Sequence, residues 1–524
     1  MKASCCRFVF LVCWGIWAAA AAAGEGGAVR LGPGPPKIVG MYVHQHWPYN
    51  HPYAARTWTL DDWRGYAEGL RQLGYNTLLI WPMLETMPDP LTPSDQANIE
   101  KMAGVIEVLH NELGMRVFMG LCPNVGVNSQ EAAKSTFTAR HFFYCDTRVN
   151  PGDPAALKQL MERREKLLRP LAATDGITVI DSDPGGYPGS TNAEFVNLLA
   201  EHRKMLDRLR PGIGMYYWMH AGWEGYCRFY KTGRFSWGTP QEQIDALTRL
   251  KALNPEPWGI ANGRPYAEKL GLADRVIIFN YGRIEGEPSF PLTNFGGDGA
   301  YTGGQGAGPR GVMGNAQTHC VQLPNTFAFA RGATHKTLND EDYVAFADDL
   351  VRGQGRLIVQ AWKTLAGTDT RAMGELAGRL EALPESSLQP GPLKGLLFAS
   401  PRRFVNDLAM QLRLKAAYAA FRSAAEHGQG VKEALGRFLA AAEAWQGRHG
   451  YKNAWSWPGL EEALRKLNSP VVNRVLESQL RLDAGPDPNA KETPFEQVQS
   501  VLRNTETYTP RLIAAMRTAL EAMK

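Results

Sequence analysis

The chain has 524 residues, of which 44% are hydrophobic, 21% charged and 10% aromatic. This composition is typical of a globular protein and excludes a disordered, collagenous or small disulfide-stapled chain. Lys and Arg total 57 against 52 Asp and Glu, which is far from the concentrated basic surface that neutralises a phosphate backbone, so we exclude nucleic acid as a partner.

The N-terminal segment has the pattern of a secretory signal. Lys2 and Arg7 precede an apolar stretch, and an alanine tract ends at Ala23, which is the order of charged, apolar and small residues found before a cleavage point. We therefore predict a signal peptide over residues 1–23, a linker over residues 24–36, and a secreted or periplasmic protein with no membrane attachment after cleavage. A retained anchor is the alternative, because the apolar run approaches the roughly 20 residues of a spanning helix.

Short apolar runs alternate with helical patterns along most of the chain. The runs span residues 38–43, 77–81, 116–121, 177–180, 214–219, 258–261, 276–279 and 312–316. The helical patterns span residues 60–73, 98–113, 154–171, 192–209 and 240–253. This alternation predicts an α/β fold, a (β/α)8 TIM barrel over residues 37–365. An open sheet is the alternative, because residues 282–311 show no helix.

Beyond Leu365 the strands stop and helical patterns continue to the C-terminus. They span residues 371–382, 403–426, 431–446, 460–467 and 510–524. Their apolar residues recur at three- and four-residue spacing, which is typical of helices packed against one another. We predict an all-helical C-terminal domain over residues 366–524.

The end of the fourth predicted strand carries two aspartates. The chain there reads Asp181-Ser-Asp183-Pro-Gly-Gly, and because side chains alternate along a strand, we expect Asp181 and Asp183 to share a face, with Cβ atoms roughly 6 to 7 Å apart. Two carboxyl groups in a partly desolvated cleft resist simultaneous ionisation, so one stays protonated beside a carboxylate. Glycosidic bond cleavage uses such a pair, because an acid protonates the leaving oxygen while an anion stabilises or attacks the sugar.

We predict that Asp183 is the general acid/base and that Asp181 is its orienting or nucleophilic partner. The reverse assignment is open, as are a capping or ion-paired role for one of them and the choice between retention and inversion. Glu224 is the best substitute for either aspartate, and Glu85 is a weaker one.

Aromatic, histidine and amide side chains follow the predicted strands. Flat rings suit the apolar faces of sugars, and amides hydrogen-bond with hydroxyl groups. Because the functional groups of a (β/α)8 barrel gather at the carboxyl ends of its strands, we predict a carbohydrate substrate at this end. The predicted substrate-binding residues are Tyr42, His44, His46, Trp81, Asn124, Trp218, His220, Trp223, Glu224, Asn280, Tyr281, Asn315 and Gln317, and Trp47, Asn262 and His319 occupy similar positions.

The region of about residues 37–330 resembles the secreted (β/α)8 glycoside hydrolases, above all the retaining β-N-acetylhexosaminidases and their relatives. The resemblance rests on the run from Asp175-Gly-Ile to Asp181-Ser-Asp183, which is also similar to the chitinase strand that ends in alternating acids. It implies that two acidic residues at the end of the fourth strand carry catalysis. One protonates the leaving oxygen, and the other orients the 2-acetamido group of the substrate, which is the nucleophile.

Two other classes of protein stay open. His44-Gln-His46 resembles the paired metal ligands of amidohydrolase-like barrel enzymes, and His220 follows the fifth strand, but Asn262 follows the sixth and the eighth run offers no aspartate. The second class is a non-catalytic carbohydrate-binding protein, since a fold does not fix a function. The residues favour a glycosidase that uses neither a metal ion nor another cofactor.

Overall fold

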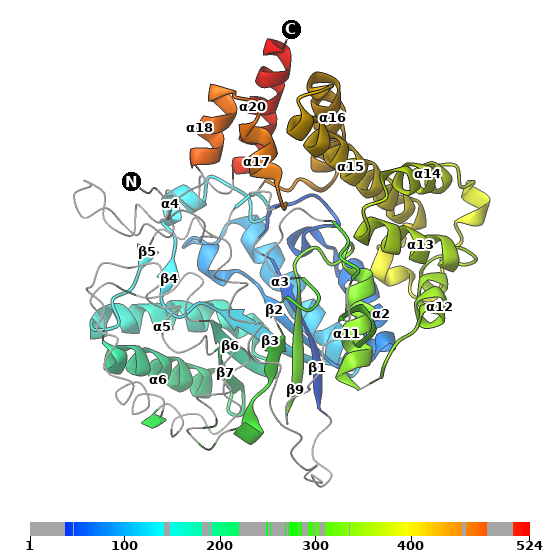
Figure 1. Ribbon diagram of the computed structural model, residues 1–524. Coiled ribbons are helices and arrows are strands. Elements are labelled where there is room, and N and C mark those ends of the chain that lie inside the picture. The colour runs from blue at the N-terminus through cyan, green and yellow to red at the C-terminus, as the bar shows by residue number, and fades with distance from the viewer. Residues whose placement is uncertain are drawn as a thin grey trace.

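The structure of the chain is a computed structural model (Figure 1). It describes residues 37–45, 47–140, 147–180, 187, 191–218, 248–249, 252, 268, 271, 273–280, 282–285, 292–296, 299–302, 310–334, 336–452, 457–478 and 507–523.

Seven parallel strands form the main sheet. They are β1 (Ile38–His44), β2 (Thr77–Trp81), β3 (Arg116–Leu121), β6 (Gly176–Ile180), β7 (Gly214–Trp218), β8 (Ile278–Asn280) and β9 (Gly311–Ala316). The order in the sheet is β7-β6-β3-β2-β1-β9-β8, so the last strand pairs with the first, as it does in a barrel. The run predicted at residues 258–261 lies outside the described residues, and closure between β7 and β8 stays a prediction.

The strands lie where the apolar runs place them because their residues are almost all buried. Every residue of β1, β2 and β6 is buried, as expected for a parallel sheet covered on one face by helices and filled on the other by side chains. A short antiparallel pair, β4 (Val125–Gly126) with β5 (Thr147–Arg148), lies beyond the end of β3.

The helices between the first strands begin at side-chain caps. They are α2 (Leu60–Leu73), α3 (Pro93–Glu107), α5 (Pro154–Leu168) and α6 (Asn192–Leu209). The predicted bounds of α2 and α6 are confirmed. The predicted start of α3 at Asn98 was wrong, because Thr92 and Asp95 form a capping box and Pro93 fits the first helical position. The helix predicted over residues 240–253 lies almost entirely outside the described residues.

Helices alone follow β9 (Figure 1). They are α11 (Leu323–Ala333), α12 (Asp340–Leu350), α13 (Gly355–Ala366), α14 (Thr370–Glu381), α15 (Pro401–His427), α16 (Val431–His449), α17 (Leu460–Arg465), α18 (Pro470–Ser478) and α20 (Tyr508–Ala522). The sequence patterns missed α11, α12, α13 and α18. In α11 ten of the eleven residues are buried, so it has no polar face to give a helical period.

Two hydrophobic cores divide the described residues. The first continues from the sheet through α11, α12, α13 and α14 into the first half of α15, where Leu412 is its last member. The second begins at Leu414 and joins the rest of α15 to α16, α17, α18 and α20, and it also includes Trp47, Tyr49 and Tyr53. The change of core therefore falls within α15 rather than at residue 365.

Asp407 of α15 holds the segment between β1 and α2 against the C-terminal helices. Its Oδ2 accepts hydrogen bonds from the Tyr53 hydroxyl at 2.6 Å and from Arg403 at 2.6 Å, and its Oδ1 accepts one from Arg448 of α16 at 3.0 Å. The side chain of Asp407 is only 5% exposed. One buried carboxylate thus joins three segments that lie far apart in the sequence.

Among the described helices, none is long and apolar enough to cross a membrane.

Candidate functional site

The inner face of the sheet carries aromatic and polar side chains near its carboxyl end. Tyr42 pairs with Asn315 of β9, and His44 pairs with Trp81 of β2. Paired residues of neighbouring strands present their side chains on the same face, and residues two apart along a strand share a face. These four side chains therefore lie on one face, and the structure brings these predicted site residues together.

The opposite face is the one that helices cover. A Cβ atom on Gly314, the neighbour of Asn315, would lie 3.0 Å from Cζ of Phe329 in α11. On the inner face, Phe279 of β8 packs against Tyr42, with ring centroids 5.7 Å apart. The tetrad of Tyr42, His44, Trp81 and Asn315 thus lies on the face of the sheet opposite to α11.

His44 and Asn315 form the central polar contact of the tetrad. The Nε2 atom of His44 lies 2.6 Å from Oδ1 of Asn315, and both residues are buried. Burial lowers the pKa of His44 to about 3, although the hydrogen bond to Asn315 opposes this effect. The ring of Tyr42 lies beside it, with centroids 3.9 Å apart. His44 is therefore neutral near pH 7.

Glu285, which the sequence patterns did not reveal, supports this contact by hydrogen bonds to Asn315. Its main-chain oxygen accepts a hydrogen bond from Nδ2 of Asn315 at 2.7 Å, and its main-chain N–H donates to the Asn315 carbonyl at 3.0 Å. Its carboxylate accepts hydrogen bonds from the main-chain N–H groups of Gln317 at 2.7 Å and Thr318 at 2.6 Å, and from the Thr318 hydroxyl at 2.6 Å. Burial raises the pKa of Glu285, and these donors oppose the rise.

Gln317 lies at the end of β9 and contacts the segment after β1. Its Oε1 accepts a hydrogen bond from the indole N–H of Trp47. The ring of Trp47 is parallel to that of Tyr49, with centroids 5.9 Å apart, and Tyr49 in turn lies 5.1 Å from the ring of Tyr451, which follows α16. Gln317 therefore joins the strand ends to the helical part of the chain.

Glu85 anchors Trp81 rather than presenting a free carboxylate. The indole N–H of Trp81 lies 3.3 Å from Oε2 of Glu85, and the main-chain N–H of Cys122 also donates to this carboxylate. Arg164 of α5 lies 3.9 Å from it, and both side chains are at most 2% exposed. Burial raises the pKa of Glu85, and Arg164 opposes the rise. Glu85 is thus a supporting group for Trp81.

Two further predicted site residues, Asn124 and Asn280, are not members of the tetrad. Nδ2 of Asn124 donates to the carbonyl of Val149 at 3.0 Å, which holds the segment after β3 to the one after β5. Asn280 pairs with Gly314 and alternates with the inward-facing Phe279, so it lies on the helix-covered face. Its Nδ2 is buried, with no hydrogen-bond partner among the residues that the structure describes.

The remaining predicted site residues are not described with their side chains. β7 ends at Trp218, of which only the main chain is described. On β6, Thr178 pairs with Gly120 of β3. The side of Gly120 where a Cβ would stand is covered by Trp81, so Thr178 lies on the same face of the sheet as Trp81. The residues that lie outside the described ranges are Asp181, Asp183, His46, His220, Trp223, Glu224, Asn262 and Tyr281.

The metal-site alternative rests on His44, His46 and His220, and of these the structure describes only His44. Among the described residues, no group of three His, Cys, Asp or Glu side chains could hold a metal ion. Nε2 of His44 is already engaged with Asn315, so His44 has only Nδ1 to offer as a ligand. His46 lies outside the described residues.

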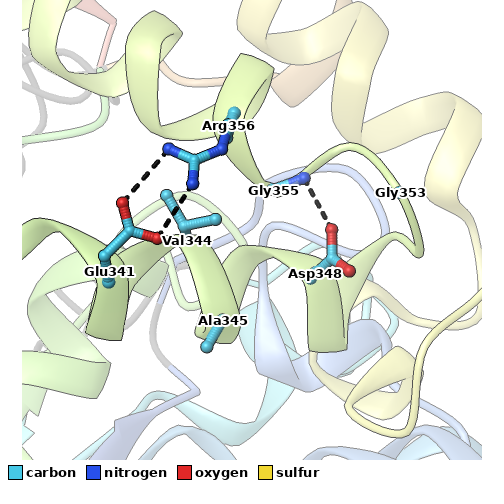
Figure 2. A pocket seen from close by; sticks show the side chains of 7 residues that line it. All are labelled: Glu341, Val344, Ala345, Asp348, Gly353, Gly355 and Arg356. Atoms are coloured by element: carbon cyan, nitrogen blue, oxygen red, sulfur yellow. Dashed lines mark hydrogen bonds and ion pairs between the residues drawn. The ribbon is translucent and has the colours of Figure 1, made fainter.

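A surface hollow between α12 and α13 lies elsewhere in the molecule (Figure 2). Arg356 makes two hydrogen bonds of 3.1 Å to Glu341 across it, and Oδ1 of Asp348 accepts one from the main-chain N–H of Gly355 at 2.9 Å. No predicted site residue lines this hollow. Because Arg356 and Glu341 are bonded to each other across it, we regard the hollow as the groove beside a surface ion pair rather than as a binding site.

The supporting residues differ in how visible they are in the sequence. Arg164 stands on the buried stripe of α5 with Leu157, Leu160, Met161, Leu167 and Leu168. An arginine at an apolar position of a helix signals a buried charge that needs a partner. Glu285 follows β8 in a segment without helical or strand period, and no comparable signal marks it.

Comparison with known proteins gives likeness in structure only. No protein-family model matches the chain, and no curated protein matches it in sequence. The Family 89 Glycoside Hydrolase from Clostridium perfringens is similar with a TM-score of 0.44 at 10% identity, over 93% of this chain and 64% of that one. A GH138 enzyme targeting pectin rhamnogalacturonan II has a TM-score of 0.43 at 9% identity, over 79% and 62%. CpGH84B has a TM-score of 0.40 at 8% identity, over 78% and 73%.

The chain spans less than two thirds of the length of the first two structures. At TM-scores of 0.44 and below, these likenesses define neither a family nor the residues of a site.

Proposed function

We propose that the chain is a glycoside hydrolase that binds its saccharide at the carboxyl ends of the parallel strands. The observation that carries this proposal is the tetrad, in which two aromatic rings and a histidine–asparagine pair share the inner face of the sheet. Rings and neutral hydrogen-bonding groups side by side match the apolar faces and hydroxyl groups of a sugar. Trp47 and Gln317, which follow β1 and β9, are also buried and hydrogen-bond with each other.

We assign the catalytic acid and its partner to Asp183 and Asp181. Among the described residues, Glu85, Asp95 and Glu285 are buried carboxylates in the segments that follow β2 and β8, and all three are engaged in supporting contacts. A group that must exchange protons with a substrate needs access to it, so none of them suits that role. The assignment to the aspartates rests on the sequence pattern Asp181-Ser-Asp183, with Glu224 as their substitute. The stereochemical outcome is open.

The test is hydrolysis of aryl glycosides by the full chain and by single variants. The panel contains 2-acetamido sugars, uronides and plain hexosides, and the variants are Asp181→Asn and Asp183→Asn. Asp274→Asn is the matched control, because Asp274 is exposed and precedes β8, at the opposite end of the sheet. Loss of at least about a hundredfold in kcat for the acid variant, with an unchanged control, fits general acid catalysis.

The same panel separates the alternatives. Saccharide binding by calorimetry without turnover of any glycoside would identify a carbohydrate-binding protein instead. Activity that chelation abolishes and zinc restores would identify the metal-dependent enzyme. Retained activity in both aspartate variants would move the acid to Glu224.

We also propose that the chain is exported and cleaved after Ala23. This proposal rests on the sequence of the first 23 residues. N-terminal sequencing of the protein recovered from a secreting host tests it, and a start at Gly24 is the expected result. A start at Met1 would contradict cleavage.

A further inference from the structure

We infer that Asn315 holds His44 as the tautomer with its proton on Nε2, and that Asn315 is therefore a positioning residue of the strand-end site. The geometry of three groups leads to this inference: the His44 ring, the Asn315 amide and the main chain of Glu285. The assignment of the tautomer stands on its own, and its meaning for ligand binding rests on the proposed function.

The orientation of the Asn315 amide is fixed from one side. One end of the amide lies 2.7 Å from the main-chain oxygen of Glu285. A carbonyl oxygen only accepts hydrogen bonds, so the amide must present its NH2 group there. The amide oxygen then faces His44.

The tautomer of His44 follows from that orientation. The Asn315 oxygen lies 2.6 Å from Nε2 of His44. An amide oxygen also only accepts, so Nε2 must carry the proton. Since the buried ring is neutral, its lone pair is then on Nδ1.

The supporting frame around this contact is rigid. His44, Asn315, Gln317 and Thr318 are at most 6% exposed. Glu285 bonds to the Asn315 main chain as well as to its side chain, and its carboxylate binds two consecutive N–H groups of the same segment. A flipped Asn315 amide would place its oxygen against the Glu285 carbonyl and leave buried polar groups without hydrogen bonds, which is unfavourable.

This arrangement limits what His44 can do chemically. Nδ1 is the ring atom that carries the lone pair, and the Nε2 proton points to Asn315 rather than to a ligand. In the proposed saccharide site His44 is therefore a hydrogen-bond acceptor through Nδ1 and not a proton donor. Nε2 has no lone pair to offer a metal ion.

The experiment is nuclear magnetic resonance of the full chain labelled with ¹⁵N-histidine, through long-range correlations between ring protons and ring nitrogens. The chain has 11 histidines, so His44→Gln identifies the His44 signals by their absence. Near pH 7 we expect the Nε2–H pattern for wild type. The Nδ1–H pattern, or a doubly protonated ring, would overturn the inference.

Two variants of Asn315 test its role. Asn315→Leu removes the acceptor, and we expect His44 to show a mixture of both tautomers. Asn315→Asp keeps an acceptor, and we expect the Nε2 proton to be retained. Asn325→Leu is the matched control, because Asn325 is also a buried asparagine and its amide donates to the Ile284 carbonyl at 3.0 Å. A wild-type pattern in Asn315→Leu would show that Asn315 does not set the tautomer.

The activity readout is separate from the spectroscopic one. If the chain hydrolyses a glycoside, we expect Asn315→Leu to raise KM about 3- to 10-fold with kcat nearly unchanged, which corresponds to one hydrogen bond. A chain without glycosidase activity would refute the proposed function and leave the tautomer assignment intact. An unchanged KM together with the expected tautomer change would refute the positioning role.

Discussion

Removal of the Asp407 carboxylate is expected to destabilise the whole chain more than any surface ion pair does. Asp407 accepts hydrogen bonds from Tyr53, Arg403 and Arg448, at 2.6, 2.6 and 3.0 Å. Arg403 also donates to the Leu397 carbonyl at 3.0 Å and is 11% exposed in its side chain. Its charge is therefore nearly buried, and Asp407 is its compensating anion.

The magnitude follows from what Asp407→Ala leaves behind. Breaking a buried ion pair by removing one partner costs about 3–5 kcal/mol, because the other charge is left uncompensated. We take the lower half of this range, since the side chain of Arg448 is 38% exposed and can turn to water. The expected loss is about 3–4 kcal/mol from a free energy of unfolding that is about 5–15 kcal/mol for a typical domain.

Asp407→Asn is expected to lose less, about 1–3 kcal/mol. The asparagine keeps one oxygen, and its NH2 group can turn toward Arg448, which is the more exposed donor. The assay is unfolding in urea, followed by fluorescence and circular dichroism, with the free energy of unfolding compared among the variants. Glu433→Ala is the control, because Glu433 pairs with Arg437 on the surface and is 76% exposed, so its loss is expected below about 1 kcal/mol.

A loss below about 1 kcal/mol for Asp407→Ala would refute this reasoning, because it would mean that the buried arginine finds other partners.

The Asp407→Ala substitution should also affect the residues at the strand ends. Tyr53 and Trp47 belong to the same segment after β1 and to the same core, so we expect Asp407→Ala to weaken saccharide binding as well.

Three further predictions follow from the described residues. Arg164→Met leaves Glu85 without its cation and the Cys122 and Val125 carbonyls without their donor. We therefore expect the free energy of unfolding in urea to fall by about 2–4 kcal/mol. Arg169→Met is the control, because Arg169 lies at the exposed end of the same helical segment. Gly314→Ala would bring Cβ within 2.6 Å of Cδ1 of Ile284 and 3.0 Å of Cζ of Phe329. We expect its free energy of unfolding to fall by about 1–3 kcal/mol. Gly374→Ala in α14 is the control, because its Cβ meets no atom within 4 Å, and we expect it to be neutral or stabilising. Burial lowers the pKa of His44 and His319 to about 3 and of His202 to about 4, so below pH 6.5 the unfolded chain binds protons that the folded chain does not. Stability should therefore fall between pH 6.5 and 4 by up to about 1.4 kcal/mol per pH unit for each histidine. The raised pKa values of Glu85 and Glu285 have the opposite effect above pH 4.5, since the folded chain then binds protons that the unfolded chain does not. If urea titrations show equal or greater stability at pH 5 than at pH 7, the histidines do not dominate the pH dependence of stability.

Sequence patterns located the strands and the capped helices well because both depend on neighbouring residues. The runs at residues 77–81 and 116–121 became β2 and β3 without change, and α6 has the predicted bounds. α3 shows the limit, since the pattern of apolar residues began later than the capping box of Thr92 and Asp95. The buried helix α11 shows a second limit, because a helix without a polar face carries no period.

The grouping of strand-end residues was predicted in part, and their role in binding stays a prediction. Tyr42, His44, Trp81 and Asn315 share one face of the sheet. The predicted group also included Asn280, which lies on the other face, because the register of a short strand is set by its neighbours and one residue of shift reverses the side chain. The assignment of the two aspartates as catalytic stays a prediction.

The order of residues along the chain was sufficient to establish parallel strands alternating with helices, a helical C-terminal part, and aromatic and amide groups at the strand ends, because hydrophobic period and capping are local properties. Only the tertiary structure decided that Glu285 supports Asn315 and Gln317, that Arg164 compensates Glu85, and that Asp407 joins α15 to Tyr53. Each of these contacts joins residues at least 30 positions apart, and a buried charge selects its partner by proximity in space, which no local pattern encodes.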